Sequence, residues 1–317
     1  MRRGQVRACW GATPAPPYGS GYDPTIGGAC TMSGYVTSAY GRLRRVLLCE
    51  PRYFRFMPSN ETAKAYLARG ESVDLQRARR EHADLARALA EAGAEVVWLE
   101  PQEDLPYQVF TRDLGTATAA GALLGQLRWD FRQREIEVAR AQIARYIPIW
   151  KQVPADEGAI FEGGDFMYLD SHRAALGIGA RTTEAGAQWV QTFLRELDVE
   201  VIPVPFDPRF CHLDMIFNVV AERVCVACPQ ALPEAFLARL RQERWEIVET
   251  TPDDVLNLLG NLFAVDQGVV ISPQHNARVN RALQALGIRV IEVELVELLK
   301  GGGGPHCMTY PLLRDPL

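Results

Sequence analysis

The sequence predicts an α/β fold in which five copies of a ββαβ module close into one ring. Short β-runs recur at intervals of roughly 50 residues, beginning near residues 95, 148, 200, 246 and 289. Each follows a segment with apolar residues at three- and four-residue steps, the pattern of a helix with one buried stripe. Because a single module of this kind cannot bury its apolar face alone, we expect the five modules to pack together, with strands towards the middle and helices outside.

The helices and the strands that follow them can be placed in chain order. The apolar stripes are Leu85 and Leu89 before the strand at 95–99, Ile136, Ala139 and Ile143 before 147–149, Trp189, Phe193 and Leu197 before 200–204, Phe236 and Leu240 before 246–248, and Val279, Leu283 and Leu286 before 289–293. Paired β-runs with small or polar turns lie between these units, at 115–125, at 166–169 with 174–178, at 216–220 with 223–227, and at 262–265 with 268–271. Such pairs indicate hairpins.

The first 31 residues differ in kind from the rest. They contain Pro14, Pro16 and Pro17 among scattered glycines, without an apolar period, and Met32 follows directly. We expect residues 1–31 to be a disordered or over-long N-terminal extension and residues 32–317 to form a single catalytic domain.

Composition narrows the class of protein. The chain has 317 residues, a net charge of −5 and 48% hydrophobic residues, without the basic stripe of a nucleic-acid binder. It has neither an apolar run long enough to span a membrane nor a secretory signal pattern, so we expect a cytoplasmic protein that binds neither nucleic acid nor membrane. Seven cysteines, an odd number, indicate free thiols, one of which is a candidate for reactivity.

Four segments place acid, imidazole and thiol groups at module boundaries. They read F-T-R-D at 110–113, E-G-G-D at 162–165, H-L-D at 212–214, and G-G-G-G-P-H-C-M-T at 301–309. The last is the most informative. Its four glycines allow the backbone to pass close to other groups, and we expect Cys307, which follows them, to lie on the last strand. We favour a catalytic thiol over a buried cysteine or a flexible linker, since an apolar β-like pattern resumes directly after Cys307.

His212 is the candidate general acid and base. On a strand, residues two apart share a face, so we expect His212 and Asp214 to point into one cavity. A hydrogen-bonded structural histidine is the plain alternative. Metal binding is the rival chemistry, but only five histidines occur and none has the spacing of a zinc site, so we expect no metal.

Four acids, Asp113, Glu162, Asp165 and Asp214, suggest a negatively charged pocket. A turn could explain the pair around Gly163–Gly164, and a surface ion pair could explain Asp113 beside Arg112. Taken together they suit a planar cation with several donors, because carboxylates match a guanidinium in two-pronged hydrogen bonds.

At these motifs the sequence resembles the guanidine-modifying superfamily of penteins, which includes arginine deiminase, dimethylarginine dimethylaminohydrolase and the amidinotransferases. The resemblance covers about residues 41–315, and its specific part is the four motifs in this order. It implies a five-bladed α/β propeller of five ββαβ modules around a pseudo-five-fold axis, and no metal or organic cofactor.

The resemblance also implies roles for individual residues. Cys307 is similar to the nucleophile, His212 to the proton shuttle, and Glu162 to the carboxylate that holds a guanidinium nitrogen and assists proton transfer. Substrate-binding roles fall to Asp113 and Asp214 as guanidinium clamps, and to Arg181, with Arg132 or Arg134 in support, as partners of a substrate carboxylate. Asp165 is expected to bind substrate as a further member of the acidic pocket. Surface positions are the alternative for these arginines.

The implied reaction is hydrolysis of L-arginine or an N-methylated arginine to citrulline through a covalent thiouronium intermediate. Asp214 favours an unmethylated substrate, whereas the compact length is nearer to that of dimethylarginine hydrolases. An amidinotransferase, an arginine dihydrolase that forms ornithine, and a non-catalytic binding protein are the alternatives. The partners expected are a small guanidino substrate and, as an open alternative to a monomer, a second copy in a homodimer.

Overall fold

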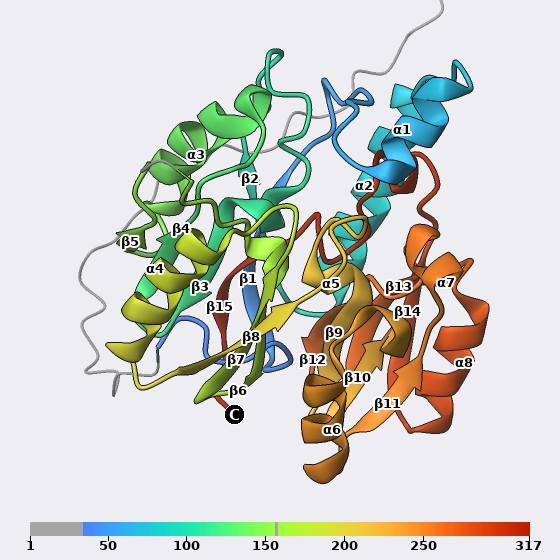
Figure 1. Cartoon of the computed structure of the whole chain (residues 1–317). Helices are drawn as coiled ribbons and strands as arrows, with labels where there is room; N and C mark the ends of the chain where they lie inside the picture. Colours follow the sequence, from blue (N-terminus) through green and yellow to red (C-terminus); the bar gives the residue numbers. More distant parts are fainter. Residues whose placement is uncertain (1–33, 156–157) are drawn as a thin grey trace, which may run out of the picture. The chain divides into compact units, whose positions relative to one another are not determined.

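The computed structural model describes residues 34–155 and 158–317. The extension expected over residues 1–31 lies outside the described residues and stays a prediction. Within the described part, the chain forms five three-stranded sheets, one for each predicted module (Figure 1).

Each sheet contains an antiparallel pair and a third strand that runs parallel to the middle strand, as in the pairs β6–β7 and β7–β8. The sheets are β15 (Tyr310–Arg314), β1 (Leu43–Cys49) and β2 (Glu95–Leu99); β3 (Gly115–Thr118), β4 (Gly121–Leu124) and β5 (Ile149–Gln152); β6 (Phe166–Asp170), β7 (Arg173–Ile178) and β8 (Glu200–Pro205); β9 (Phe217–Ala221), β10 (Val224–Ala227) and β11 (Glu246–Glu249); and β12 (Phe263–Asp266), β13 (Val269–Pro273) and β14 (Arg289–Val293). The third strands begin within one residue of the predicted starts.

The first sheet joins two distant parts of the chain. Its middle strand β1 pairs in parallel with β2, but its antiparallel partner is β15 near the C-terminus, with Leu47 opposite Tyr310. The strand that directly follows the fourth motif therefore lies next to the first strand of the fold.

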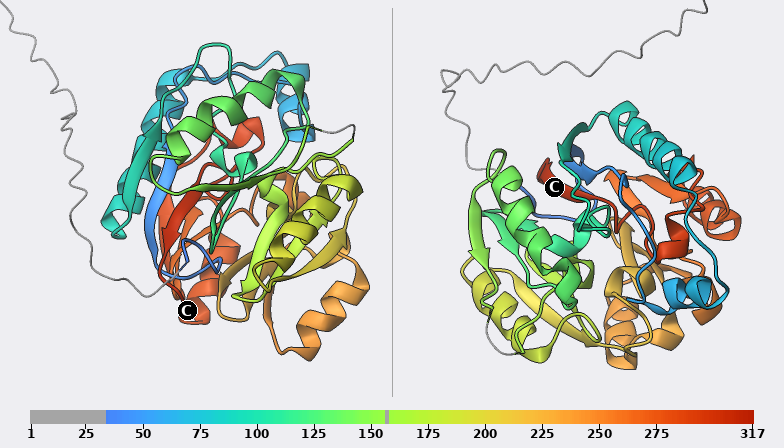
Figure 2. Two further views of the ribbon diagram at one scale, coloured as in Figure 1. Left: turned by 90° about the vertical axis from the view of Figure 1, so that its left-hand side faces the viewer. Right: turned by 90° about the horizontal axis from the view of Figure 1, so that it is seen from above.

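One helix in each module leads from the middle strand to the third strand. These five helices are α2 (Leu75–Glu91), α3 (Asp130–Ile143), α4 (Glu184–Arg195), α6 (Glu234–Gln242) and α8 (Ala277–Ala285). Three shorter ones, α1 (Glu61–Ala68), α5 (Leu213–Ile216) and α7 (Pro252–Leu256), lie in connections. Seen from above, the five connecting helices lie outside the strands (Figure 2). None of the helices in the described residues is long and apolar enough to cross a membrane.

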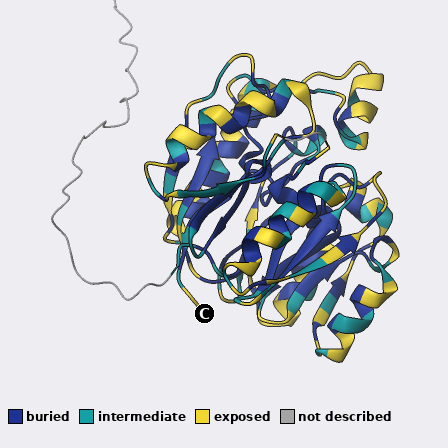
Figure 3. Cartoon of the chain, turned by 60° about the vertical axis from the view of Figure 1, so that its left-hand side comes forward, coloured by how far each residue is buried: buried dark blue, intermediate teal, exposed yellow. Residues whose placement is uncertain are grey.

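Helix α4 shows how local sequence sets these boundaries. The Thr183 side chain accepts a hydrogen bond from the Gly186 N–H at 3.2 Å, which caps the first turn. Val190 and Leu194, four residues apart, are buried on the same face. The chain leaves the helix through Asp198, whose φ of 57° ends the helical run before β8. Figure 3 shows the resulting pattern of exposed and buried bands on the helices over largely buried strands.

The antiparallel partners of the five middle strands, here called the inner strands, are β3, β6, β9, β12 and β15. Strand β3 packs against β15, and β9 packs against both β6 and β12. The Arg314 side chain on β15 donates to the Ala264 carbonyl on β12 at 2.8 Å, which joins the last sheet to the first. The predicted propeller of five ββαβ modules is confirmed.

Candidate active site

Every predicted motif directly precedes an inner strand. Thr111–Leu114 and Gly163–Asp165 form short 3-10 turns before β3 and β6, α5 precedes β9, and the Cys307 turn precedes β15. The 3-10 turns contact each other, and α5 contacts the second of them. One cavity is consequently lined by Asp113, Arg132, Arg181, His212 and Cys307, which come from four different modules and their connections.

Two local expectations are wrong. His212 and Asp214 do not share a strand, because α5 begins at Leu213 and His212 is its extended N-cap. The Asp165 carboxylate accepts the Leu213 N–H at 2.9 Å, which orders the start of this helical turn. Cys307 does not lie on the last strand either, since Thr309 Oγ1 bonds to the Pro305 and His306 carbonyls and holds the cysteine in a turn.

The Cys307 thiol lies in a buried polar setting. Asn261 Nδ2 donates to its Sγ at 3.1 Å, and the Sγ lies 3.5 Å from Asp214 Oδ2. Burial raises the pKa of Cys307 well above its ordinary value, and the charges of Asp214 and Asp113 raise it further. The thiol is therefore neutral in the free protein, and a cation beside it would favour the thiolate.

His212 is held by a carboxylate. Its Nε2 lies 2.7 Å from Glu162 Oε2, and its Nδ1 lies 3.6 Å from the Cys211 thiol and 3.7 Å from Asp113 Oδ1. Burial by itself lowers the pKa of His212, but Cys211, Asp113 and Glu162 outweigh burial and raise this pKa well above its ordinary value. The imidazole is thus poised as a cation that can give a proton.

Glu162 is fully buried and receives three hydrogen bonds. Besides His212, the Arg181 Nη1 donates to Oε2 at 2.9 Å and the Arg128 main-chain N–H donates to Oε1 at 2.7 Å. Burial raises the pKa of Glu162, but Arg181 and His212 outweigh it and hold this pKa well below its ordinary value. In the neighbouring turn, a Cβ on Gly164 would meet the His212 ring at 2.7 Å, so a glycine is needed for this close packing.

Asp113 and Asp214 each keep one oxygen free. Asp113 Oδ2 accepts from Arg132 Nη1 at 2.6 Å, and Asp214 Oδ2 accepts from His306 Nδ1 at 2.8 Å. The other oxygen of each carboxylate is buried and has no hydrogen-bond partner within the described residues. Two buried acceptors without hydrogen bonds suit a ligand with several N–H donors. Asp113 is buried and pairs with Arg132, which excludes the surface ion pair with Arg112.

The other predicted residues have structural contacts of their own. Arg132 is buried, and Glu135 and Asp113 together occupy its guanidinium. Arg181 donates to Glu162 and, at 2.8 Å, to the Ser59 carbonyl. Burial raises the pKa of Asp165 to about 7, and its Oδ2 has no partner in the described part of the chain. Their roles toward a substrate remain predictions.

The cavity is small and has a wider vestibule. Its volume is about 20 Å³, room for about one water-sized group. Beside it lies a pocket of about 280 Å³ whose lining includes Lys64, Arg128, Arg181 and Arg209. Asn60 borders both pockets, caps α1 and donates to the Gly301 carbonyl at 2.9 Å.

Sequence reasoning missed Asn261 and assigned no role to His306. Asn261 contacts the Cys307 Sγ and accepts the His306 N–H at 3.0 Å, and it lies two residues before the inner strand β12. The signal was available, because each of the other four inner strands is preceded by one of the four motifs. The segment before β12 contains no acid, histidine or cysteine between Leu256 and Phe263, so it does not resemble the four motifs in composition.

Asp113, Glu162 and His212 each place a donor atom within 4.8 Å of the others, a grouping that could hold a metal ion. Here Arg181 and the Arg128 N–H already engage the two oxygens of Glu162. The expectation of a metal-free site stays a prediction.

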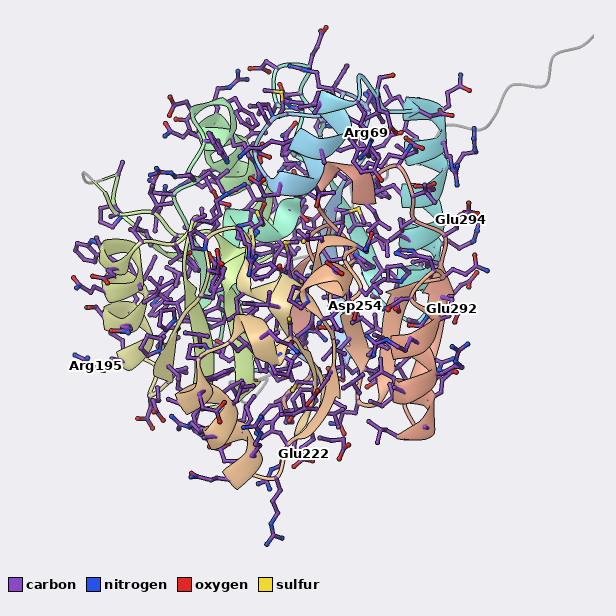
Figure 4. The ribbon with its side chains drawn as sticks, turned by 45° about the vertical axis from the view of Figure 1, so that its right-hand side comes forward. Arg69, Arg195, Glu222, Asp254, Glu292 and Glu294 are labelled. Carbon is purple, nitrogen blue, oxygen red and sulfur yellow. The ribbon has the colours of Figure 1, made fainter. Side chains whose placement is uncertain are left out.

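The distribution of charge sets this site apart from the exterior. Arg195, Glu222 and Glu294, labelled in Figure 4, lie at the periphery. The acids around Cys307 and His212 are buried instead.

Comparison with known proteins gives the family. Residues 50–314 match the family described as N,N dimethylarginine dimethylhydrolase, eukaryotic. The chain is 31% identical over 278 residues to the uncharacterized protein YkgA of Bacillus subtilis, which covers 87% of this chain and 93% of that protein. It is 30% identical over 251 residues to the arginine deiminase of Rhodococcus erythropolis, covering 68% of this chain and about 62% of that enzyme's length.

Solved structures agree on the fold. The N-terminal domain of ArgZ, an arginine dihydrolase from cyanobacteria, superposes with a TM-score of 0.75 at 23% identity over 85% of this chain and 97% of that chain. A dimethylarginine dimethylaminohydrolase adduct superposes with a TM-score of 0.69 at 22% identity over 84% and 99%. The chain therefore belongs to the N,N-dimethylarginine dimethylhydrolase family, within the pentein superfamily.

Proposed function

We propose that this chain is a cysteine-dependent hydrolase that converts a guanidino amino acid, preferably L-arginine, to citrulline and ammonia. One observation carries the proposal: a thiol, an imidazole and the Asp113 carboxylate line a single cavity, and the Asp214 carboxylate lies 3.5 Å from the thiol. Each carboxylate keeps one buried oxygen without a hydrogen-bond partner in the described residues. A guanidinium would supply both the positive charge and the N–H donors that this arrangement lacks.

The first step is formation of the nucleophile. The Cys307 thiol is neutral in the free protein, because burial and the neighbouring acids raise its pKa. A guanidinium held between Asp113 and Asp214 offsets those charges and favours the thiolate, whose proton passes to solvent, so nucleophile formation is coupled to substrate binding. Asn261, which donates to the Sγ, then stabilises the thiolate.

The chemical steps follow from the positions of Cys307 and His212. The thiolate sulfur bonds to the guanidinium carbon, and His212 gives its proton to the departing nitrogen as the carbon–nitrogen bond breaks. A water then loses a proton to His212 and adds to the same carbon, and cleavage of the carbon–sulfur bond releases the ureido product and restores the cysteine. Glu162 holds the imidazole as a cation before each turnover. Its predicted contact with a guanidinium nitrogen remains part of the proposal.

The free carboxylate oxygens favour an unmethylated substrate. Methyl groups would remove N–H donors and leave a buried acceptor unpaired, which costs about 1–3 kcal/mol, or roughly one to two factors of ten in kcat/KM. The basic vestibule fits the carboxylate of an amino acid, with Arg181 as the predicted partner and Arg209 beside it. We propose that Arg132, which Glu135 and Asp113 engage, supports Asp113 rather than the carboxylate.

Product analysis tests this proposal. The purified protein is incubated with L-arginine, with asymmetric dimethylarginine, and with arginine plus an acceptor amine, and citrulline, ammonia, dimethylamine and ornithine are quantified together. We expect citrulline and ammonia from arginine. Ornithine with two equivalents of ammonia would indicate a dihydrolase, and ornithine with a new guanidino compound would indicate an amidinotransferase. No product from any substrate would refute the proposal.

Cys307→Ser provides the matched check on the nucleophile. It should abolish turnover while the melting temperature stays close to that of the parent protein, because the hydroxyl is of similar size but far less acidic. Turnover at a rate near that of the parent would contradict the assignment of Cys307.

A further inference from the structure

A second small cavity is lined in part by residues that come before and after Cys307 in the chain, His306 and Arg314 among them. Its volume is about 20 Å³, and its lining includes Ser38, Arg112, Thr116, His306 and Arg314. It contains two arginines and no aspartate or glutamate among the residues that line it. A space of this size holds about one water-sized species.

Arg314 has an unused donor at this cavity. Its side chain is 3% exposed, and its two terminal nitrogens donate to the Gly41 and Ala264 carbonyls at 2.6 and 2.8 Å. The Nε is buried and has no partner within residues 34–155 and 158–317. Carbonyls satisfy two of its donors but leave its charge without a counter-ion.

Arg112 shares this situation. It is buried, and its Nε donates to the His306 carbonyl at 3.4 Å. The Arg112 and Arg314 guanidinium carbons lie 5.8 and 5.1 Å from the centre of the same ring, Phe263. Two cations therefore gather around one aromatic side chain and one cavity.

The other buried arginines of the described chain are compensated directly. Arg132 forms ion pairs with Asp113 and Glu135, and Arg181 forms one with Glu162. Neither Arg112 nor Arg314 forms an ion pair in the part of the chain that the structure describes. Leaving a buried charge unpaired is costly, so a missing counter-ion is indicated.

Both guanidinium groups keep their charge at neutral pH. Burial lowers the pKa of Arg112 to about 10, although Asp214 and Cys307 act on it from a distance in the opposite sense. Burial and the charge of Arg112 lower the pKa of Arg314 to about 9, with Asp266 opposing them. The two groups are therefore cations that repel each other.

We infer that this cavity binds one small monovalent anion, chloride, between Arg112 and Arg314. The volume of about 20 Å³ fits a small anion better than sulfate or phosphate, and the lining supplies two positive charges and no negative one. Because the Arg112 main chain donates to the Cys307 carbonyl at 3.0 Å, a bound anion would also steady the turn that carries the thiol. This site differs from the guanidino cavity, which is lined by Asp113 and His212.

Bromide is the direct probe. Crystals of the full chain grown without chloride are soaked in sodium bromide, and anomalous diffraction is recorded at the bromine edge. We expect a peak within contact distance of the Arg314 Nε and the Arg112 guanidinium. A peak confined to other places, or density for water alone in the cavity, would overturn the inference.

Thermal unfolding gives a measurement in solution. Sodium gluconate is replaced by sodium chloride at constant ionic strength, and we expect the melting temperature to rise to a plateau, by at least about 2 °C. The Arg314→Met variant should lose this dependence, whereas Arg281→Met, which removes an exposed arginine on α8, should keep it. Equal responses of all three proteins would refute the site, and if Arg314→Met does not fold, the bromide experiment on the parent protein decides.

Discussion

Glu162→Gln is the most informative single change in the catalytic network. The substitution keeps the size of the side chain but removes its negative charge. In the parent protein the Glu162 Oε2 lies 2.9 Å from Arg181 Nη1 and 2.7 Å from His212 Nε2. Both donors are buried cations, and an amide can offer only one oxygen to them. The Arg128 N–H, now bonded to Oε1 at 2.7 Å, would face the new NH₂ group if that oxygen turned toward the cations.

The expected cost follows from these contacts. Removing one partner of a buried ion pair costs about 3–5 kcal/mol, because the remaining charge stays buried without compensation. We therefore expect the free energy of unfolding to fall by about this amount at neutral pH. Glu137→Gln on the exposed face of α3 is the control, and it should change that free energy by less than about 0.5 kcal/mol.

The pH dependence has a definite sign. The folded-state pKa of Glu162 lies below its unfolded value, so its contribution to stability is present above the unfolded pKa, about 4.3, and is lost as the pH falls through the folded pKa. The folded-state pKa of His212 is raised, so its contribution is complete below about pH 6.5 and is lost as the pH rises through the folded pKa. Without Glu162, both contributions shrink.

Activity provides the second measurement. Glu162 helps to raise the pKa of His212, so its loss should move the alkaline limb of the kcat/KM profile to lower pH. The loss of an effective proton donor is expected to reduce kcat by about 10² to 10⁴. An unchanged alkaline limb, together with a stability loss below about 1 kcal/mol, would refute this account of the Glu162–His212 pair.

Three further predictions address entry, binding and cofactor. Gly302→Ala introduces a Cβ that would lie 2.5 Å from the Asn60 side chain, at a residue whose φ is 92°, so this variant should lower both stability and kcat/KM. The control is Gly287→Ala, at a φ of 81° with open space around it, which should lower stability alone. An equal loss of activity in both variants would argue against the contact with Asn60. Asp214→Asn should reduce kcat/KM for arginine by roughly tenfold to a hundredfold. Asp214→Asn should also lower the pKa of Cys307, because the negative charge of Asp214 raises that pKa in the parent protein. A thiolate titration, followed by ultraviolet absorbance, that is the same in both proteins would contradict this. Dialysis against a chelator should leave turnover unchanged, and loss of turnover that a divalent metal restores would show that the site needs a metal.

Much of the fold could be predicted because its information is local and repeated. The third strands begin where the apolar helix stripes end, as with α4 and β8, and capping residues such as Thr183 mark helix starts in the sequence. The pairing of β1 with β15 is not local, because neither strand carries a signal that identifies its partner across the length of the chain.

In the candidate site, too, some residues could be predicted from the sequence and others could not. The motifs that contain Asp113, Glu162, His212 and Cys307 were recognisable because each puts unusual chemistry just before an inner strand. Asn261 occupies the fifth such place, but an asparagine in a loop is common, so its sequence carries no comparable signal. Its importance depends on a distance of 3.1 Å to a sulfur that lies 46 residues away.

The sequence by itself determined the five-module fold, the family and the set of reactive groups, since these depend on periodicity and on residue type in ordered motifs. Only the tertiary structure decided how the groups are paired. Asp214 bonds to His306 beside Cys307, Glu162 bonds to His212, and Arg132 supports Asp113. These pairings depend on how turns from different modules meet within a few ångströms, and hydrogen bonds and charges act over that range. Spacing along the chain does not contain those distances.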